Sequence, residues 1–346
     1  MNMAKFSLPT DFSDFIIDAV IELNRNYSRL GRRIEELYGG LPENLGFGCG
    51  RQAGLLPPVT PEKLLGHIKH AQKKGLKFNY IFNAVCLGNK EFDHKYKKKL
   101  DRLLGHLSDI GARCLTLTNP LLVKMIKRNF PKLRLTASAF CDINTVPKAL
   151  AWQDLGVHRI TLDLSANVDL SLLKQLRKDL KIELSLVANS SCNRNCPYES
   201  YHGQIYSHLE NSPPKIPLPT LCIYEKLKDP ALILKNSALI RPEDIKTYRK
   251  IGIDRFKITG RGYAQDTLLN RAKAYLRGSY KGNALDIMDI NLNRIFFIDN
   301  SMLLPAYKLS SISNRKIEKS IKTMDAATRK SLLASLEKEL AYLMPV

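Results

Sequence analysis

An alternation of short β-rich runs with amphipathic helix patterns constrains the fold of this 346-residue chain more than any other feature of its sequence. Helix start and stop signals separate the runs; for example, Thr60 can cap a helix that has Pro61 in its first turn and ends at Gly75. Repeated β–α units predict parallel strands joined by right-handed crossovers, and eight strands close a barrel. The expected strands are 45–49, 76–84, 114–119, 133–139, 158–164, 182–188, 231–236 and 254–259. We therefore expect an α/β fold, a (β/α)8 TIM-like barrel, with a doubly wound open sheet as the alternative.

Three segments are expected along the chain. A helical pattern at 13–40 predicts an N-terminal helical extension over residues 1–44, and the barrel domain follows over residues 45–282. Residues 283–346 are expected to form a C-terminal extension, because a polar helical pattern near the end predicts a terminal helix and not a second catalytic domain.

The N-terminal residues carry acids and a proline where a secretory signal would be apolar, and no apolar run approaches the roughly 18 residues of a membrane span. We therefore expect a cytoplasmic protein that does not enter the membrane. Its seven cysteines are an odd number, and a reducing compartment disfavours disulfides. The thiols are expected to be core residues, metal ligands or nucleophiles.

Four cysteines lie where a barrel enzyme carries its chemistry, at the carboxyl ends of the strands. Cys49 ends the first expected strand, Cys192 and Cys196 follow the sixth, and Cys222 lies in the same long insertion, 189–230. Convergent thiolates in a reducing compartment bind zinc or an iron–sulfur cluster. The spacing matches neither paired zinc knuckles nor the three-cysteine run of radical enzymes, so an iron–sulfur site, a zinc site and unligated thiols all remain open. Small buried apolar roles are expected for Cys86, Cys114 and Cys141.

The net charge of +21 comes from 54 Lys and Arg against 33 Asp and Glu. Such an excess attracts polyanions such as RNA, or a small anionic substrate. The alternative is a lysine-rich composition spread over solvated helix faces, as at 94–102, because the basic residues are not interleaved with aromatic residues.

Other candidate residues also follow the expected strands. Lys257 and Arg261 stand at the end of the eighth, where barrels often bind a phosphate or carboxylate; an internal ion pair is the alternative. His202 lies near the cysteines and is a candidate proton carrier, or only a loop histidine. Small polar residues near strand ends can orient a polar substrate or cap the next helix. These residues are Asn83, Asn119, Ser138, Asp163, Asn189 and Asn236.

Several stretches carry a family resemblance over residues 45 to 280. They are "GFGCGR" at 46–51, "LTASAFCDINTVPKAL" at 135–150, "IELSLVANSSC" at 182–192, Cys222 and "FKITGRG" at 256–262. In these stretches the chain resembles the collagenase-like peptidase family, the class of unassigned catalytic type numbered thirty-two, which includes oxygen-independent hydroxylases. The first stretch is similar to a segment of the accessory subunit of the oxygen-independent ubiquinone hydroxylases. Thr259 stands where the family's signature usually has glutamate.

The resemblance implies a (β/α)8-like barrel with a 4Fe–4S cluster on Cys49, Cys192, Cys196 and Cys222. It also implies oxygen-independent hydroxylation of an aromatic or other small anionic substrate, with a family-related protein as a possible second subunit. An RNA base hydroxylase or RNA-binding accessory protein is the first alternative. A peptidase, as the family's name suggests, is the second, although no nucleophile–base arrangement can be picked out from the sequence.

Overall fold

In the computed structural model, which describes residues 3–51, 53–208, 218–309 and 314–341, eight parallel strands form a closed barrel. Each strand pairs with the next along the chain, and the last pairs with the first, so that Lys257 lies beside Ser7. The strands are β1 Ala4–Pro9, β2 Arg32–Gly39, β3 Lys77–Phe82, β4 Cys114–Leu117, β5 Arg134–Ala137, β6 Arg159–Thr161, β7 Glu183–Val187 and β8 Arg255–Lys257. The expected TIM-like barrel is confirmed.

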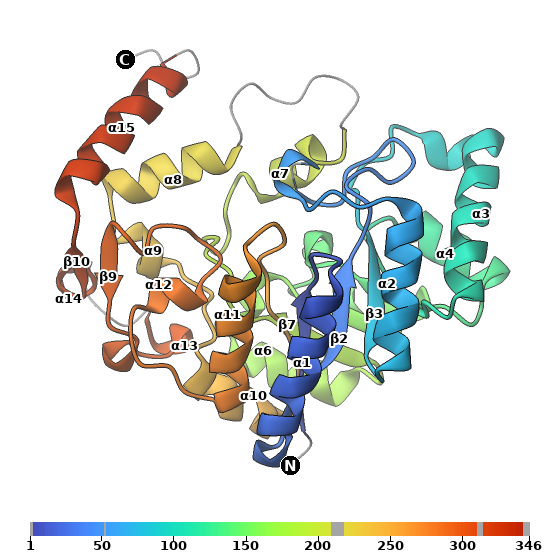
Figure 1. Ribbon diagram of the computed structural model, residues 1–346, viewed down its shortest axis with the longest axis horizontal. Coiled ribbons are helices and arrows are strands. Elements are labelled where there is room, and N and C mark those ends of the chain that lie inside the picture. The colour runs from blue at the N-terminus through green and yellow to red at the C-terminus, as the bar shows by residue number, and fades with distance from the viewer. Residues whose placement is uncertain (1–2, 52, 209–217, 310–313, 342–346) are drawn as a thin grey trace.

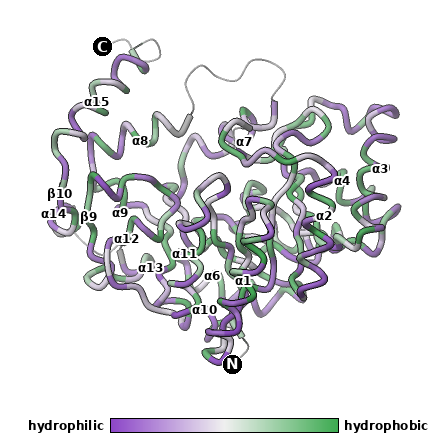
Figure 2. Tube along the Cα trace, in the orientation of Figure 1, coloured by the Kyte–Doolittle hydropathy of each residue, from purple (hydrophilic) through white to green (hydrophobic). Residues whose placement is uncertain are grey.

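A ring of helices surrounds the strands, one in each β–α unit (Figure 1). These helices are α1 Asp14–Tyr27, α2 Pro61–Lys73, α3 His94–Asp109, α4 Pro120–Asn129, α5 Val146–Asp154, α6 Leu170–Asp179, α10 Ile245–Ile251 and α11 Gln265–Arg277. Along them hydrophilic and hydrophobic residues alternate (Figure 2), because one face of each helix packs on the barrel. Among the described residues, no helix has both the length and the apolar character needed to cross a membrane.

Two expected strands are wrong. Residues 45–49 form a loop, in which Leu45 and Gly46 both take positive φ values, and residues 231–236 contain a short helix, α9 Leu232–Lys235. The two missing strands are β1 and β2, which lie within residues 1–44. That segment is therefore part of the barrel and not an extension outside it, and its helix α1 connects the first two strands.

The missed strand β2 is difficult to recognise because charged side chains point into the barrel. Glu36 is 1 % exposed and is held by Arg159, whose Nη1 lies 2.9 Å from its Oε1. Ser7 and Asn79 donate further hydrogen bonds to the same carboxylate. Burial is offset by these contacts, with Arg159 the strongest, so that the pKa of Glu36 is lowered. Glu36 stands in a charged stretch that would ordinarily be exposed to solvent, but it is buried because it has these partners.

The insertion after β7 and the C-terminal segment pack together beside the barrel (Figure 1). Tyr224 donates to Glu337 across this contact, and Arg329 donates to the carbonyl of Leu227. A separate apolar core lies beneath these two segments. The elements are α8 Leu218–Lys228, α9, α12 Ala284–Ile287, β9 Phe296–Ile298, α13 Ala306–Leu309, α14 Asn314–Lys319, β10 Ile321–Thr323 and α15 Ala326–Leu340, with β9 and β10 antiparallel. The expected terminal helix is α15.

Candidate active site at the barrel mouth

Three of the four expected cysteine ligands lie close together above the barrel. Cys192 and Cys196 precede α7, Glu199–Ile205, which lies over the mouth, and Cys222 lies on α8 (Figure 1). Burial raises the pKa of Cys222, nearby Lys226 lowers it, and Cys192 and Cys196 raise it further. The three sulfurs are thus near enough to interact electrostatically.

Cys49, the fourth expected ligand, is fully buried in the loop that follows β2. Its sulfur accepts a hydrogen bond from Nη1 of Arg261 at 3.0 Å, and Nη2 of the same arginine donates to the Cys49 carbonyl. Tyr38, Leu56 and Ile81 pack around it. The thiol therefore faces the end of β8.

Contacts next to Cys49 nevertheless join its loop to the loop of the other cysteines. Arg51 forms an ion pair with Asp289, and the carbonyl of Asp289 accepts from the hydroxyl of Ser191, one residue before Cys192. Burial raises the pKa of Tyr206 to about 12; Arg51 lowers it, and Cys222 and Cys192 raise it. Arg51 therefore lies in the same neighbourhood as those two thiols, two residues from Cys49.

The cysteine sulfurs do not form a site for a single ion. In the described part of the chain, the only three metal-ligating groups with ligand atoms all within 4.8 Å of one another are carboxylates. The four thiols of a zinc site all touch one ion, whereas the thiolates around a 4Fe–4S cluster each bind a different iron and lie farther apart. The thiols of the described residues therefore do not form a preformed single-ion zinc site.

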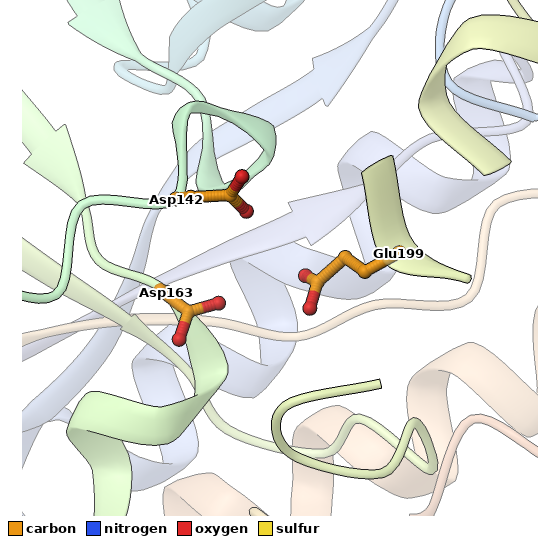
Figure 3. A group of neighbouring side chains, drawn as sticks. All are labelled: Asp142, Asp163 and Glu199. Atoms are coloured by element: carbon orange, nitrogen blue, oxygen red, sulfur yellow. The ribbon is translucent and has the colours of Figure 1, made fainter. Parts of the chain in front are cut away.

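The three carboxylates belong to Asp142, Asp163 and Glu199, and they point toward one another (Figure 3). Asp142 follows β5, Asp163 follows β6 and Glu199 begins α7, so they meet at the same end of the barrel as the cysteines. Burial, followed by the charges of Asp163 and Asp142, raises the pKa of Glu199 to about 7. This carboxyl can hold or release a proton near neutral pH. Our sequence prediction included Asp163 as a strand-end residue but missed the other two.

A group of cations lies at the end of β8 and beneath the cysteines. The Lys257 Nζ is 4.3 Å from the centre of the Tyr38 ring, and Lys257 has no ion pair among the described residues. Burial, and then the charge of Arg261, lower the pKa of Lys257 to about 7. The two residues therefore do not form the internal ion pairs given as the alternative: Arg261 binds Cys49, and Lys257 lies over an aromatic ring.

Some of the expected polar residues line the same end of the barrel, whereas others do not. Asn83 and Ser138 are buried neighbours, and the Asn83 amide oxygen has no hydrogen-bond partner among the described residues. Asn189 binds the backbone and hydroxyl of Thr259, so it ties β7 to β8. Asn119 caps α4.

Asn236 is exposed at the end of α9, so its expected place at a strand end is wrong. Its side chain lies at the surface, although its carbonyl accepts from the Arg194 amide. The apolar run "ALILKN" is too short for a strand and a helix to be told apart by periodicity alone, which is why the position was misplaced.

His202 lies on α7 between the rings of Tyr198 and Tyr206, with ring centres 6.5 and 6.3 Å away. Burial lowers its pKa. Of the other cysteines, Cys114 is buried and Cys141 is half-buried, and burial raises their pKa values to about 11 and about 12. Cys86 is half-buried and its sulfur accepts from the amide of Gly88.

Comparison with known proteins gives a consistent assignment. Residues 30–278 match the sequence profile of peptidase family U32. The chain is 29 % identical over 312 residues to the "Uncharacterized protease MJ1657" of Methanocaldococcus jannaschii, covering 87 % of this chain and 90 % of that protein. The solved structure of the U32 peptidase Mk0906 is 17 % identical, with a TM-score of 0.53 over 74 % of this chain and 92 % of that one. This last likeness supports the fold.

Proposed function

The chain belongs to peptidase family U32, and from this we propose that it is an iron–sulfur protein that supports oxygen-independent hydroxylation of an aromatic or other small anionic substrate. The observation that carries the proposal is the grouping of Cys192, Cys196 and Cys222 at the barrel mouth, with Cys49 on the adjoining loop. When bound, a 4Fe–4S cluster would supply one-electron redox chemistry at this position.

The donor set fits such a cluster. Four sulfurs are available, and three lie within electrostatic range of one another. Burial raises the pKa of Cys192 and of Cys222, and the charge of Lys226 opposes this effect at both thiols. Arg261 donates a hydrogen bond to the sulfur of Cys49. Thiolates, and not thiols, are the form that binds iron.

The other residues at the mouth would bind and orient the substrate. Lys257 and the nearby arginines create a positive region that suits a carboxylate or phosphate. The amide oxygen of Asn83, beside Ser138, can accept a hydrogen bond from a polar substrate group. Glu199 can take up or deliver a proton near neutral pH, and His202 on the same helix is a second candidate for that role.

The proposal is tested by purifying the protein without oxygen and measuring iron and acid-labile sulfide. We expect about four irons and four sulfides per chain, with a brown colour. Cys192→Ser and Cys49→Ser should remove the colour, whereas Cys114→Ser and Cys86→Ser serve as matched controls that keep it. Stoichiometric zinc without sulfide, or colour that survives both ligand substitutions, would contradict the cluster.

RNA as the substrate is a second candidate, which a basic groove favours. The groove has a volume of about 500 Å³ and lies between α6 and α10. Lys174, Lys178 and Lys250 in its lining are exposed and have no ion pair among the described residues, and no acidic residue of the described chain lines it. Together with the net charge of +21, these lysines form a surface that suits the phosphate groups of a nucleic acid.

This second candidate is tested by tRNA binding over a range of salt concentrations. Replacing the three lysines with glutamine should weaken binding and reduce the salt slope by up to about one for each phosphate that is no longer neutralised. Three matched substitutions on α3, at Lys95, Lys97 and Lys98, are the control. Equal effects of the two triple variants, together with no hydroxylated nucleoside that depends on the protein in cells, would remove RNA as the substrate.

Peptide hydrolysis has weaker support from the arrangement of side chains. The relative from M. jannaschii is named a protease, and the matching family has a peptidase name. Among the residues that the structure describes, however, no serine or cysteine side chain is hydrogen-bonded to a histidine. The Thr10 hydroxyl is bonded to His67, but both side chains are buried. Digestion of casein or gelatin by the purified protein, lost on replacing Glu199, would favour this activity instead.

A further inference from the structure

Lys257 is an unusual lysine because it sits inside the barrel mouth without a carboxylate partner among the described residues. It ends β8, between Ser7 of β1 and Val187 of β7, and its ammonium group lies over the ring of Tyr38 from β2. Part of its surface remains accessible, so a small molecule that enters the mouth can reach it.

The charges that face Lys257 favour its neutral amine. Burial has the largest effect, and the positive charges of Arg261, Arg159 and Arg51 act in the same direction. The face of the Tyr38 ring attracts the ammonium form, and among the charged groups Glu36 also opposes the neutral amine. This carboxylate is already bound by Arg159, Ser7 and Asn79. With its pKa lowered to about 7, roughly half of the amine is unprotonated at neutral pH.

A desolvated lysine next to other cations, at the carboxyl end of a barrel strand, is the arrangement that makes an amine nucleophilic. We propose that Lys257 is a nucleophile that forms an imine with the carbonyl carbon of a small anionic aldehyde or 2-oxo acid. This activity does not depend on the iron–sulfur cluster proposed above.

The chemistry balances without an oxidant or reductant. The lone pair of the Lys257 Nζ attacks the carbonyl carbon, and the electrons of the C=O π bond move to the oxygen. The carbinolamine then loses that oxygen as water, whose two hydrogens both come from the amine, and a C=N bond remains. The guanidinium groups of Arg51 and Arg261 lie in the same positive region and would attract the carboxylate or phosphate of the substrate.

The test traps the imine chemically in the full-length protein. The protein is incubated with glyoxylate and sodium cyanoborohydride, which reduces an imine to a stable secondary amine, and the modified lysines are located by proteolysis and mass spectrometry. We expect Lys257 to be modified at least tenfold faster than Lys97, an exposed lysine on α3. Propionaldehyde, which has no charge, should lose most of this preference.

Two controls keep the result interpretable. Lys257→Met should remove the fast phase, whereas Lys77→Met, at the opposite end of the barrel, should keep it. In the unaltered protein the rate of modification at Lys257 should rise with pH through a midpoint near pH 7. None of the other titratable groups that face this amine is expected to change charge near that pH; they are Tyr38, Glu36, Arg51, Arg159 and Arg261. Modification spread over lysines according to their exposure, or a midpoint near that of an ordinary lysine, would overturn the proposal. Iron content measures separately whether the protein holds the proposed cluster, so a failure of the imine proposal can be told apart from a failure of the cluster proposal.

Discussion

Arg261 holds Cys49 through both the side chain and the backbone: Nη1 lies 3.0 Å from the sulfur, and Nη2 lies 2.6 Å from the carbonyl oxygen. One arginine beyond β8 thus holds the loop that follows β2, and only β1 lies between these two strands in the barrel. The amide of Gly48, which donates to the carbonyl of Ser207, and the ion pair of Arg51 with Asp289 hold other parts of the loop. Among the described residues, Arg261 is the residue that hydrogen-bonds the sulfur of Cys49 itself.

Replacing Arg261 with methionine should release this loop. We expect the free energy of unfolding to fall by about 1.5–3 kcal/mol, since two charge-assisted hydrogen bonds are removed. In protein without metal, iodoacetamide should react faster with Cys49 and as slowly as before with buried Cys114. Arg113→Met, at an exposed arginine, is the matched control, and unchanged labelling of Cys49 would show that the other contacts hold the loop in place without Arg261.

The buried pair of Glu36 and Arg159 gives a second prediction. Both side chains are almost fully buried, so removing one leaves an uncompensated charge in the barrel. Glu36→Gln and Arg159→Met should each lower the free energy of unfolding by about 3–5 kcal/mol in urea. The double variant should be more stable than the sum of the two losses predicts, because neither charge then remains alone. Strictly additive losses would mean that the pair is not coupled.

Buried His67 predicts a dependence of stability on pH. Burial lowers its pKa from 6.5 to about 4, and its Nε2 lies 2.8 Å from the Thr10 hydroxyl. Because the folded-state pKa lies below the unfolded value, the unfolded chain binds more protons between these values. Stability from this residue is therefore complete above pH 6.5 and is lost as pH falls toward 4.

The loss attributable to His67 should reach roughly 3 kcal/mol at the acid end of this range. Urea unfolding of the unaltered protein and of His67→Gln, compared at pH 7.5, 5.5 and 4, isolates the contribution from that of the carboxylates. His70→Gln is a matched control on the same helix, because His70 pairs with Asp14 at the surface. Parallel pH profiles for the unaltered protein and His67→Gln would contradict the prediction.

Glu199 should change stability with pH in the direction opposite to that of His67. Its pKa rises from 4.5 to about 7 in the folded protein, so the folded state binds the extra proton between these values. Its contribution is most favourable below pH 4.5 and is lost as the pH rises through 7. Glu199→Gln should therefore be more stable than the unaltered protein above pH 7, and the two should be similar at pH 4.5.

Thermal unfolding in the presence of a chelator measures this difference without a contribution from bound divalent ions. Glu22→Gln, at an exposed glutamate of α1, controls for the loss of one negative charge. If Glu199→Gln is instead less stable at high pH, the three carboxylates do not repel one another in the folded protein.

Much of the barrel could be predicted from local sequence signals. The helix expected from Thr60 to Gly75 forms as α2, with Thr60 as its cap, because capping residues and a proline in the first turn act within a few positions of one another. Six of the eight expected strands overlap barrel strands. The spacing of Cys192 and Cys196 alone is a weak signal; they became candidate ligands because a barrel was expected to carry its chemistry at the strand ends, and that role stays a prediction.

The tertiary structure decided what depends on contacts between distant residues. Strand β2 was missed because Glu36 is buried by a partner 123 positions away, and the run 231–236 folds as a helix because the C-terminal segment packs on it. Asp142, Asp163 and Glu199 come from three separate segments and meet only when the barrel closes and α7 covers its mouth. Sequence alone determined the repeating β–α units, since their signals are local. The pairing of charges and the grouping of site residues were set by barrel closure, since electrostatic and packing energies depend on distance in space and not along the chain.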